Sequence, residues 1–368
     1  MIIIAPDSFK GTLSASEVCS IIKEEFLKID NSLDIRSIPV ADGGEGTVEA
    51  LLANGGELIN LKVTGPLFEK VNSFYGIMPD GTAVIEMAAA SGLPMVGKNR
   101  NPMLTTTFGT GELIVDALNR GCKKILIGVG GSATNDGGIG CAAVLGVKFL
   151  DKNGEIVPLN GSGLSEIADI DMSGLDLRIK DVQIEVLCDV VSPLYGKNGA
   201  AYVFAPQKGA DEKCVKLLDD GLKNLSEVVK TKLGINNAEL EGAGAAGGLA
   251  YGLVTFSGAK LVKGAKTILK ALKLEELAEN AELVITGEGC MDNQSLLGKV
   301  PAMVAELSVN ARVIAIVGMS KVNDLSGSKI EKIYPTISSP MPFAEIKRNC
   351  RDNLAKTARQ AAEDFMNE

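Results

Sequence analysis

The stretch MIIIAPDSFKGTLSASE, residues 1–17, indicates the fold class of this chain. Its apolar, β-branched start at residues 2–5 is typical of a buried strand. Ser14 and Glu17 have the spacing of a capping box, which marks the start of a helix. A polar loop containing Lys10 lies between the two. A strand, a polar loop and a helix in this order predict one unit of a parallel α/β sheet, whose ligands bind at the carboxyl ends of the strands.

The same alternation continues outward from this stretch. Strands are predicted at residues 35–40, 124–129, 282–286, 312–317 and 332–337, and helices at 16–27, 46–52, 111–119, 300–307 and 343–366. We therefore expect an α/β protein with a Rossmann-like parallel-sheet domain made of residues 1–62, 97–140 and 262–368. Hairpin signals at 71–87 and 147–157, a strand at 201–204 and a helix at 211–232 predict a second, α+β domain. This domain is expected as an insertion in two pieces, 63–96 and 141–261, with the active site in the cleft between the domains.

Composition excludes several classes of function. The 368 residues carry 37 basic and 46 acidic side chains, a net charge of −9, so nucleic acid and anionic membrane surfaces are repelled on average. The chain has no His, which excludes His-based triads, HExxH zinc sites and the HRD loop of protein kinases. Its seven Cys are single, without a CxxC pair, as expected for reduced thiols in the cytoplasm. The longest uncharged run, residues 242–259, is too rich in glycine for a good membrane span.

Glycine-rich loops with polar side chains follow several of the predicted strands. ADGGEGT at residues 41–47 holds Asp42 and Glu45. Mg²⁺ is commonly held by one or two carboxylates plus substrate phosphates, so this pair indicates a metal site. On spacing alone, a polar turn at a helix start explains the same residues almost as well.

The loop GVGGSATNDGG, residues 128–138, is the most glycine-dense polar loop of the chain. Its start matches a relaxed dinucleotide fingerprint, but polar residues then continue where an apolar helix face would be needed. We therefore favour an anion or phosphate cradle over a nicotinamide site. A third such turn, GEGCMDNQS at residues 287–295, is followed by Gly298 and Lys299 without the spacing of a P-loop. Carboxylates and phosphate cradles without His together point to metal-assisted phosphoryl transfer or phosphate-ester chemistry.

These motifs resemble those of a known family. They are APDSFKG at 5–11, ADGGEGT at 41–47, GGSATNDGG at 130–138, CDV at 188–190, PQKGA at 206–210, GAGAAGGL at 242–249 and GEG at 287–289, followed by Asp292, Gln294 and GKVP at 298–301. The chain is similar over essentially its whole length to the type-1 glycerate kinases of bacteria. The resemblance implies ATP-dependent phosphorylation of D-glycerate, typically at the 2-hydroxyl, with ATP as co-substrate. It has one notable departure, because relatives usually carry an Arg where this chain has Cys290.

From this resemblance we form a hypothesis about the site. Asp189 takes the proton of the substrate hydroxyl, with Asp292 as the second choice, and Lys10 neutralises the charge on the transferred group. Mg²⁺ is held by Asp42, Glu45 and Asp136. Phosphates and substrate are bound by Asp7, Ser8, Arg100, Gly130, Gly131, Ser132, Thr134, Asn135, Gly287, Glu288, Gly289 and Lys299, with Arg100 as the clamp for the substrate carboxylate.

Other readings stay open from the residues alone. A phosphate-ester hydrolase would use the same carboxylates and cradles. A non-catalytic sensor of sugar acids or nucleotides would bind without turnover, and a nicotinamide oxidoreductase rests only on the fingerprint match at Gly128 and Gly130. A homodimer is a further open expectation.

Overall fold

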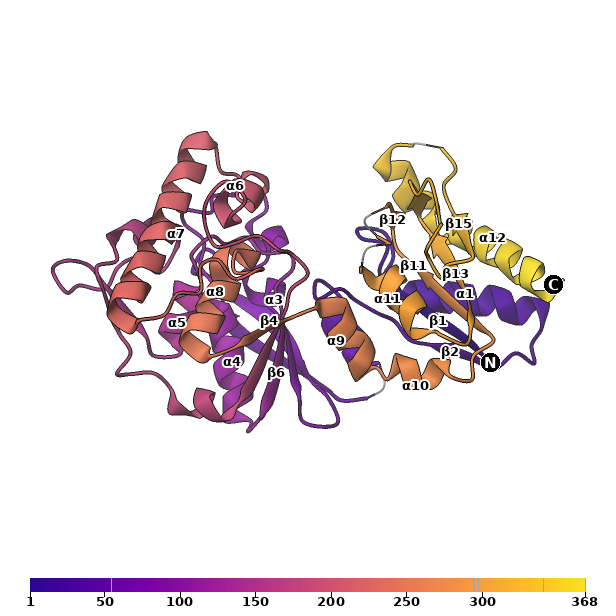
Figure 1. Ribbon diagram of the computed structural model, residues 1–368, viewed down its shortest axis with the longest axis horizontal. Helices are drawn as coiled ribbons and strands as arrows, with labels where there is room; N and C mark the ends of the chain where they lie inside the picture. The colour runs from indigo at the N-terminus through magenta and orange to yellow at the C-terminus, as the bar shows by residue number, and fades with distance from the viewer. Residues whose placement is uncertain (54, 294, 297, 340, 368) are drawn as a thin grey trace. The chain divides into compact units, whose positions relative to one another are not determined.

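The computed structural model describes residues 1–53, 55–293, 295–296, 298–339 and 341–367. Gln294, part of the motif quoted above, lies outside the described residues. The chain divides into two units, coloured along the chain in Figure 1. Unit 1 comprises Met1–Asp42, Glu49–Ala53 and Gly264–Glu368, and unit 2 comprises Gly43–Val48 and Asn54–Lys263.

Unit 1 is built on a parallel sheet of five strands in the order β15-β13-β11-β1-β2. Its strands are β1 (Ile2–Pro6), β2 (Ile35–Ser37), β11 (Leu283–Gly287), β13 (Arg312–Val317) and β15 (Lys332–Pro335), with a small separate pair β12 (Cys290–Met291) and β14 (Met319–Ser320). The helices are α1 (Ala15–Ile29), α9 (Gly264–Ala271), α10 (Leu274–Ala278), α11 (Val300–Leu307) and α12 (Phe343–Met366). Helix α2 (Thr47–Leu52) runs from unit 2 into unit 1.

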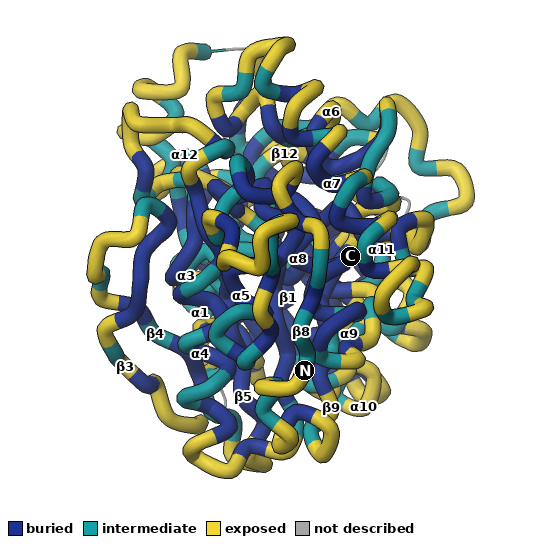
Figure 2. Tube along the Cα trace, turned by 90° about the vertical axis from the view of Figure 1, so that its left-hand side faces the viewer, coloured by how far each residue is buried: buried dark blue, intermediate teal, exposed yellow. Residues whose placement is uncertain are grey.

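The core of unit 1 explains why the first stretch of sequence folds as expected. β1 is buried along its whole length (Figure 2). Ile2 and Ile4 pack with Phe26 of α1 and Leu354 of α12, and these two helices lie side by side along the sheet (Figure 1). Helix α1 begins at the predicted capping box, because the Glu17 N–H donates to Ser14 Oγ at 3.2 Å and the Ser14 N–H donates to Glu17 Oε2 at 2.9 Å.

Unit 2 contains a mixed sheet of six strands in the order β10-β9-β6-β5-β4-β3. Its strands are β3 (Glu57–Thr64), β4 (Lys70–Ile77), β5 (Ala83–Glu86), β6 (Lys124–Gly128), β9 (Gln183–Leu187) and β10 (Lys260–Val262), and β7 (Lys148–Leu150) pairs with β8 (Asp169–Asp171). The helices are α3 (Ala88–Ser91), α4 (Phe108–Asn119), α5 (Ile139–Val144), α6 (Ala200–Phe204), α7 (Glu212–Leu233) and α8 (Ala245–Ser257), with short 3₁₀ turns at Leu93–Val96, Gly161–Glu166, Leu177–Asp181 and Pro206–Lys208. β4 pairs antiparallel with both β3 and β5. The pairs β5–β6, β6–β9 and β9–β10 are parallel.

The division of the chain differs from the expected one mainly in three segments, residues 43–48, 55–62 and 97–140, which were expected in the Rossmann-like domain and lie in unit 2. The strand expected at 124–129 in the Rossmann-like sheet is β6, and it lies between β5 and β9 in the sheet of unit 2. Residues 97–140 therefore belong to unit 2, which is one nearly continuous insertion rather than two pieces. The reason is the crossover from β5 through α4 to β6, which joins neighbouring parallel strands of one sheet.

Two local predictions are also corrected. The strand expected at 201–204 is helix α6, in which the Val203 N–H donates to the Gly199 carbonyl at 3.1 Å. A short apolar run has too few residues to distinguish the 3.6-residue period of a helix from the two-residue period of a strand. The hairpin expected at 147–157 forms its turn, because the Asp151 N–H donates to the Glu155 carbonyl at 2.8 Å and the Val157 N–H donates to the Phe149 carbonyl at 3.1 Å. Its second arm is reduced to one antiparallel bridge between residues 150 and 156, and β7 pairs along its length with β8 instead. The hairpin at 71–87 and the helices at 211–232 and 343–366 are confirmed as β4–β5, α7 and α12.

Among the residues that the structure describes, no helix is both long and apolar enough to cross a bilayer. All seven cysteines are free thiols, four of them buried.

Candidate functional site

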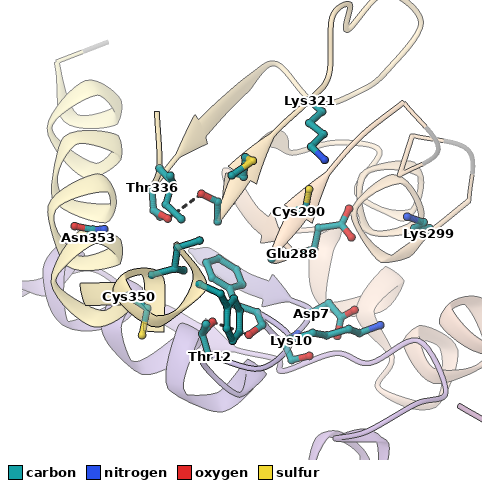
Figure 3. A pocket seen from close by; sticks show the side chains of 18 residues that line it. Asp7, Lys10, Thr12, Glu288, Cys290, Lys299, Lys321, Thr336, Cys350 and Asn353 are labelled. Atoms are coloured by element: carbon teal, nitrogen blue, oxygen red, sulfur yellow. Dashed lines mark hydrogen bonds between the residues drawn. The ribbon is translucent and has the colours of Figure 1, made fainter. Parts of the chain in front are cut away.

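A cavity of about 520 Å³ opens at the carboxyl ends of the central strands of unit 1 (Figure 3). Asp7 follows β1, Glu288 follows β11 and Gly318 follows β13, so three neighbouring strands deliver their next residues to one place. The full lining is Asp7, Ser8, Phe9, Lys10, Thr12, Glu288, Gly289, Cys290, Lys299, Gly318, Met319, Lys321, Thr336, Ile337, Phe343, Ile346, Cys350 and Asn353. We refer to this cavity as the strand-end pocket.

Two carboxylates of the strand-end pocket are held in an environment that disfavours their charge. Asp7 is 5 % exposed, and burial, reinforced by the nearby Asp42 carboxylate, raises its pKa to about 7. The Ser8 N–H donates to Asp7 Oδ1 at 2.7 Å. Burial also raises the pKa of Glu288, and its Oε1 atom is buried without a hydrogen-bond partner among the described residues. A cation near these oxygens would relieve both costs.

Lysines supply the opposite charge. The Lys10 ammonium donates to Asp42 Oδ2 at 2.6 Å. Burial alone would lower the pKa of Lys10, but the carboxylates of Asp42, Asp7 and Glu288 raise it above its ordinary value. Lys299 lies before the first turn of α11, with its Nζ 3.8 Å from Asp292 Oδ1. The pocket therefore combines buried acids with partly exposed positive charges, an arrangement suited to a phosphate and a divalent cation.

Gly287 of the GEG motif and Gly318 after β13 are required by backbone packing. A Cβ on Gly287 would lie 1.9 Å from the Ile316 carbonyl oxygen, and one on Gly318 would lie 2.3 Å from the Gly289 carbonyl oxygen. These contacts let β11 and β13 approach each other closely at their ends. The motif thus shapes the floor of the strand-end pocket, whatever ligand it receives.

Sequence reasoning missed the far side of this pocket. Phe343, Ile346, Cys350 and Asn353 come from α12, and Thr336 and Ile337 follow β15. Their spacing on α12 follows a helical stripe, but that pattern alone does not say which element the stripe faces. Only the packing of α12 against α1 brings it to the ends of the strands.

The glycine-dense loop after β6 lies in unit 2, around a buried lysine. Lys208 is 2 % exposed, and its ammonium donates to Ser132 Oγ at 2.8 Å and to the Thr134 carbonyl at 2.7 Å. Burial lowers the pKa of Lys208 to about 7, an effect that Asp136 opposes. Both polar atoms of the Asn135 side chain are buried without a partner among the described residues. Lys208 is not one of the predicted site residues, although it lies in the PQKGA motif at 206–210.

Asp136 is enclosed by the chain itself. Its Oδ2 accepts from the Thr107 N–H at 2.7 Å and the Thr107 hydroxyl at 2.8 Å, and the N–H groups of Gly138 and Gly140 also donate to its carboxylate. Burial raises the pKa of Asp136 despite these donors. The arrangement favours a structural role that joins the loop after β6 to the start of α4.

The remaining predicted residues are spread over both units. Gly130 donates to the Gly43 carbonyl at 3.4 Å, and Gly131 accepts from the Leu93 N–H at 2.8 Å. Arg100 is exposed, with its guanidinium 3.3 Å from the Gln207 carbonyl. Asp189 and Glu45 are exposed, the former just beyond β9. The structure thus brings Asp7, Ser8, Lys10, Glu288, Gly289 and Lys299 together in the strand-end pocket of unit 1, and Ser132, Thr134, Asn135 and Asp136 in one loop of unit 2.

The residues of the strand-end pocket fit a magnesium ion. No group of three or more acidic or Cys side chains that could hold a metal occurs in the described parts of the chain. Mg²⁺ does not need one, because it is usually bound by one or two carboxylates together with phosphates and water. The orphaned Glu288 Oε1 and the buried Asp7 carboxylate are oxygen donors of this kind.

A family model, two related sequences and a solved structure that resemble this chain are all described as glycerate kinases. The model of the glycerate kinase family matches residues 2–366. The chain is 47 % identical to glycerate 2-kinase of Escherichia coli (strain K12), over 98 % of this chain and 97 % of that protein. It is 45 % identical to glycerate kinase of Bacillus subtilis (strain 168), over 98 % and 96 %. A crystal structure from Salmonella typhimurium LT2, assigned as a glycerate kinase 2, superposes with a TM-score of 0.88 at 44 % identity, covering 99 % of this chain and 98 % of that one.

Proposed function

Since the chain belongs to the glycerate kinase family, and is therefore a phosphotransferase with an alcohol group as acceptor, we propose that it phosphorylates the 2-hydroxyl of D-glycerate. The products are 2-phosphoglycerate and ADP. The observation that carries this proposal at the site is the strand-end pocket, in which Lys10, Asp7 and Glu288 gather at the ends of two parallel strands. Asp42 lies beside them through its ion pair with Lys10.

The proposed roles in unit 1 follow from charge. Lys10 and Lys299 neutralise the phosphates, because both lysines line the strand-end pocket and carry a positive charge. Asp7 and Glu288 would hold Mg²⁺, with Asp42 positioned beside them by its ion pair with Lys10. Bound Mg²⁺ would offset phosphate charge and polarise the transferred group. Of the other carboxylates expected at the metal, we assign Asp136 to the scaffold, and Glu45, in unit 2, stays a prediction from the sequence.

The proton of the substrate hydroxyl needs an acceptor. We keep Asp189 as the proposed general base and Asp292 as the alternative. The Asp292 Oδ1 atom accepts from the Ser295 N–H at 3.0 Å and from its hydroxyl at 3.2 Å, which orients the carboxylate toward Ser295. Asp189 is exposed beyond β9. Loss of turnover in Asp189→Asn with retained activity in Asp292→Asn would support this order, and the opposite pattern would reverse it.

The function is tested by coupled ADP production with Mg·ATP and D-glycerate, using L-glycerate, glycolate, lactate and water as comparators. Phosphorus NMR of the product then identifies the phosphorylated oxygen. ADP that depends on D-glycerate, with a 2-phosphate signal, is the expected result. A 3-phosphate signal overturns the position, and phosphate release without glycerate indicates a phosphate-ester hydrolase instead. Cys290, exposed and part of the pocket lining, is compared as Cys290→Arg in the same assay.

A further inference from the structure

We propose that the α12 side of the strand-end pocket is a subsite for the adenine base of the nucleotide, with the Phe343 ring as its stacking surface and the Asn353 amide contacting its edge. This inference rests on the proposed function, because it places the nucleotide that the reaction consumes. It adds a ligand-binding role for α12, an element that contributes none of the predicted site residues.

The size of the cavity is the first argument. A volume of about 520 Å³ lies within the range of roughly 300–1,000 Å³ typical of pockets for drug-sized ligands. A three-carbon acid such as glycerate would fill only a small part of it. A nucleotide, with a base, a ribose and a chain of phosphates, is large enough to occupy much more of this volume.

The polarity of the lining changes from one side to the other. In Figure 3 the charged side chains Asp7, Lys10, Glu288, Lys299 and Lys321 lie on one side, while Thr336, Cys350 and Asn353 lie on the other. The side with Thr336 and Asn353 is completed by apolar residues, Ile337, Ile346 and Phe343. ATP has the same division, with charged phosphates at one end and a flat, weakly polar base at the other.

Phe343 has the exposure and the position of a stacking surface. Of the two aromatic residues in the lining, Phe9 is 4 % exposed and belongs to the core, whereas Phe343 is 58 % exposed. One part of its ring is supported by the loop after β1, because a Cβ on Gly11 would lie 3.0 Å from Phe343 Cζ. A large aromatic ring held at the rim of a pocket with its surface open to solvent is a common feature of ligand sites.

Asn353 lies on the same stripe of α12 as Phe343. Positions 343, 346, 350 and 353 follow one another at helical spacing, and all four line the pocket. The Asn353 side chain makes no hydrogen bond to any other described residue, although those around it do: Thr336 Oγ1 donates to the Gly318 carbonyl at 3.0 Å, and Cys350 Sγ donates to the Lys347 carbonyl at 3.3 Å. An amide offers one donor and one acceptor side by side, which complements adenine, whereas the corresponding edge of guanine presents two acceptors.

The test compares nucleotide binding to four variants of the full chain by titration calorimetry. Phe343→Ala should raise the Kd of Mg·ATP about tenfold or more, and Phe343→Tyr, which keeps the ring, should stay within about threefold of the native protein. Asn353→Ala should reduce the preference for ATP over GTP. Arg348→Ala, an exposed change on α12 outside the pocket, is the matched control and should bind as the native protein does.

Two further readouts separate this inference from the proposed function. The KM for D-glycerate should be unchanged in Phe343→Ala while the KM for ATP rises. ATP, but not inorganic tripolyphosphate, should protect Cys350 from alkylation by N-ethylmaleimide in the native protein, a measurement that needs no variant to fold. Native turnover combined with unchanged ATP binding in Phe343→Ala, or equal protection by tripolyphosphate, overturns the inference alone. ATP binding that depends on Phe343 without any phosphorylation of glycerate overturns the proposed function alone.

Discussion

At the residue scale, Lys208 shows how one buried charge can organise a loop. Its ammonium is covered by the chain and holds Ser132 and the Thr134 carbonyl, so the loop after β6 is tied to the turn that follows α6. Burying a lysine is costly in its charged form, and this cost appears as the lowered pKa. The stability of the protein should therefore depend on pH through this residue.

The sign of this dependence follows from proton linkage. Burial lowers the pKa of Lys208 from its ordinary 10.5 to about 7, so between these values the unfolded chain holds a proton that the folded chain does not. The free energy of unfolding should then rise as pH increases from about 7 toward 10.5. The cost of burying the charged Lys208 ammonium is fully present below pH 7. Relative to Lys208→Met, we expect the native protein to gain roughly 1 kcal/mol per pH unit between pH 7.5 and 9.5.

Urea unfolding of both proteins across this range checks the prediction. Lys216→Met, an exposed change on α7, is the control and should follow the pH dependence of the native protein. Parallel curves for the native protein and Lys208→Met would contradict the assignment of the titrating group.

At the element scale, α1 and α12 are joined by charges of very different burial. Glu25 on α1 is 4 % exposed, and the Arg359 guanidinium donates to its Oε2 through Nε at 2.9 Å and through a second nitrogen at 2.7 Å. Burial opposes the charge of Glu25, but hydrogen bonds from Lys28 and Arg359 lower its pKa below the ordinary value. The packing of α1 against α12 therefore depends, at this turn, on a buried Glu25 carboxylate that accepts hydrogen bonds from Lys28 and Arg359.

We expect Arg359→Met to lower the free energy of unfolding by roughly 1–3 kcal/mol, because it leaves Glu25 with fewer donors. The matched control is Arg351→Met on the same helix, whose ion pair with Glu17 has both side chains about half exposed. This change should cost no more than about 0.5 kcal/mol. Equal losses in the two variants, measured by denaturant unfolding, would show that burial of the pair does not matter.

At the scale of the whole molecule, the chain contains separate cores. The cluster around Ile2, Phe26 and Leu354 draws only on unit 1, and the clusters around Tyr75 and around Phe149 draw only on unit 2. Chains with more than one core often unfold in more than one step. A ligand of the strand-end pocket contacts residues of unit 1, so it should stabilise unit 1 more than unit 2.

Scanning calorimetry is therefore expected to resolve two transitions, of which Mg·ATP raises one by a few degrees. At a nucleotide concentration a hundredfold above its Kd, linkage supplies about 2.7 kcal/mol. Mg²⁺ without nucleotide serves as the control. A single transition, or an equal shift of two transitions, would contradict independent unfolding of the units.

The sequence by itself determined the elements whose signals are local. The strand of residues 2–5, the capping box at Ser14 and Glu17, and the helix over 343–366 are all present, because each depends on neighbouring residues and the face they bury. The motifs also indicated the family, and they located Asp7, Lys10 and Glu288 at strand ends, where the pocket lies.

Only the tertiary structure decided which of these elements meet. The pattern of β6 shows that it is buried but not that β5 and β9 are its partners, and the stripe of α12 does not reveal that it completes the strand-end pocket. Burial of Lys208 was equally hidden, because a lysine in a PQKG turn is usually solvated. Periodicity records that a face leaves water, whereas the surface that covers it is chosen by contacts between residues far apart in the chain.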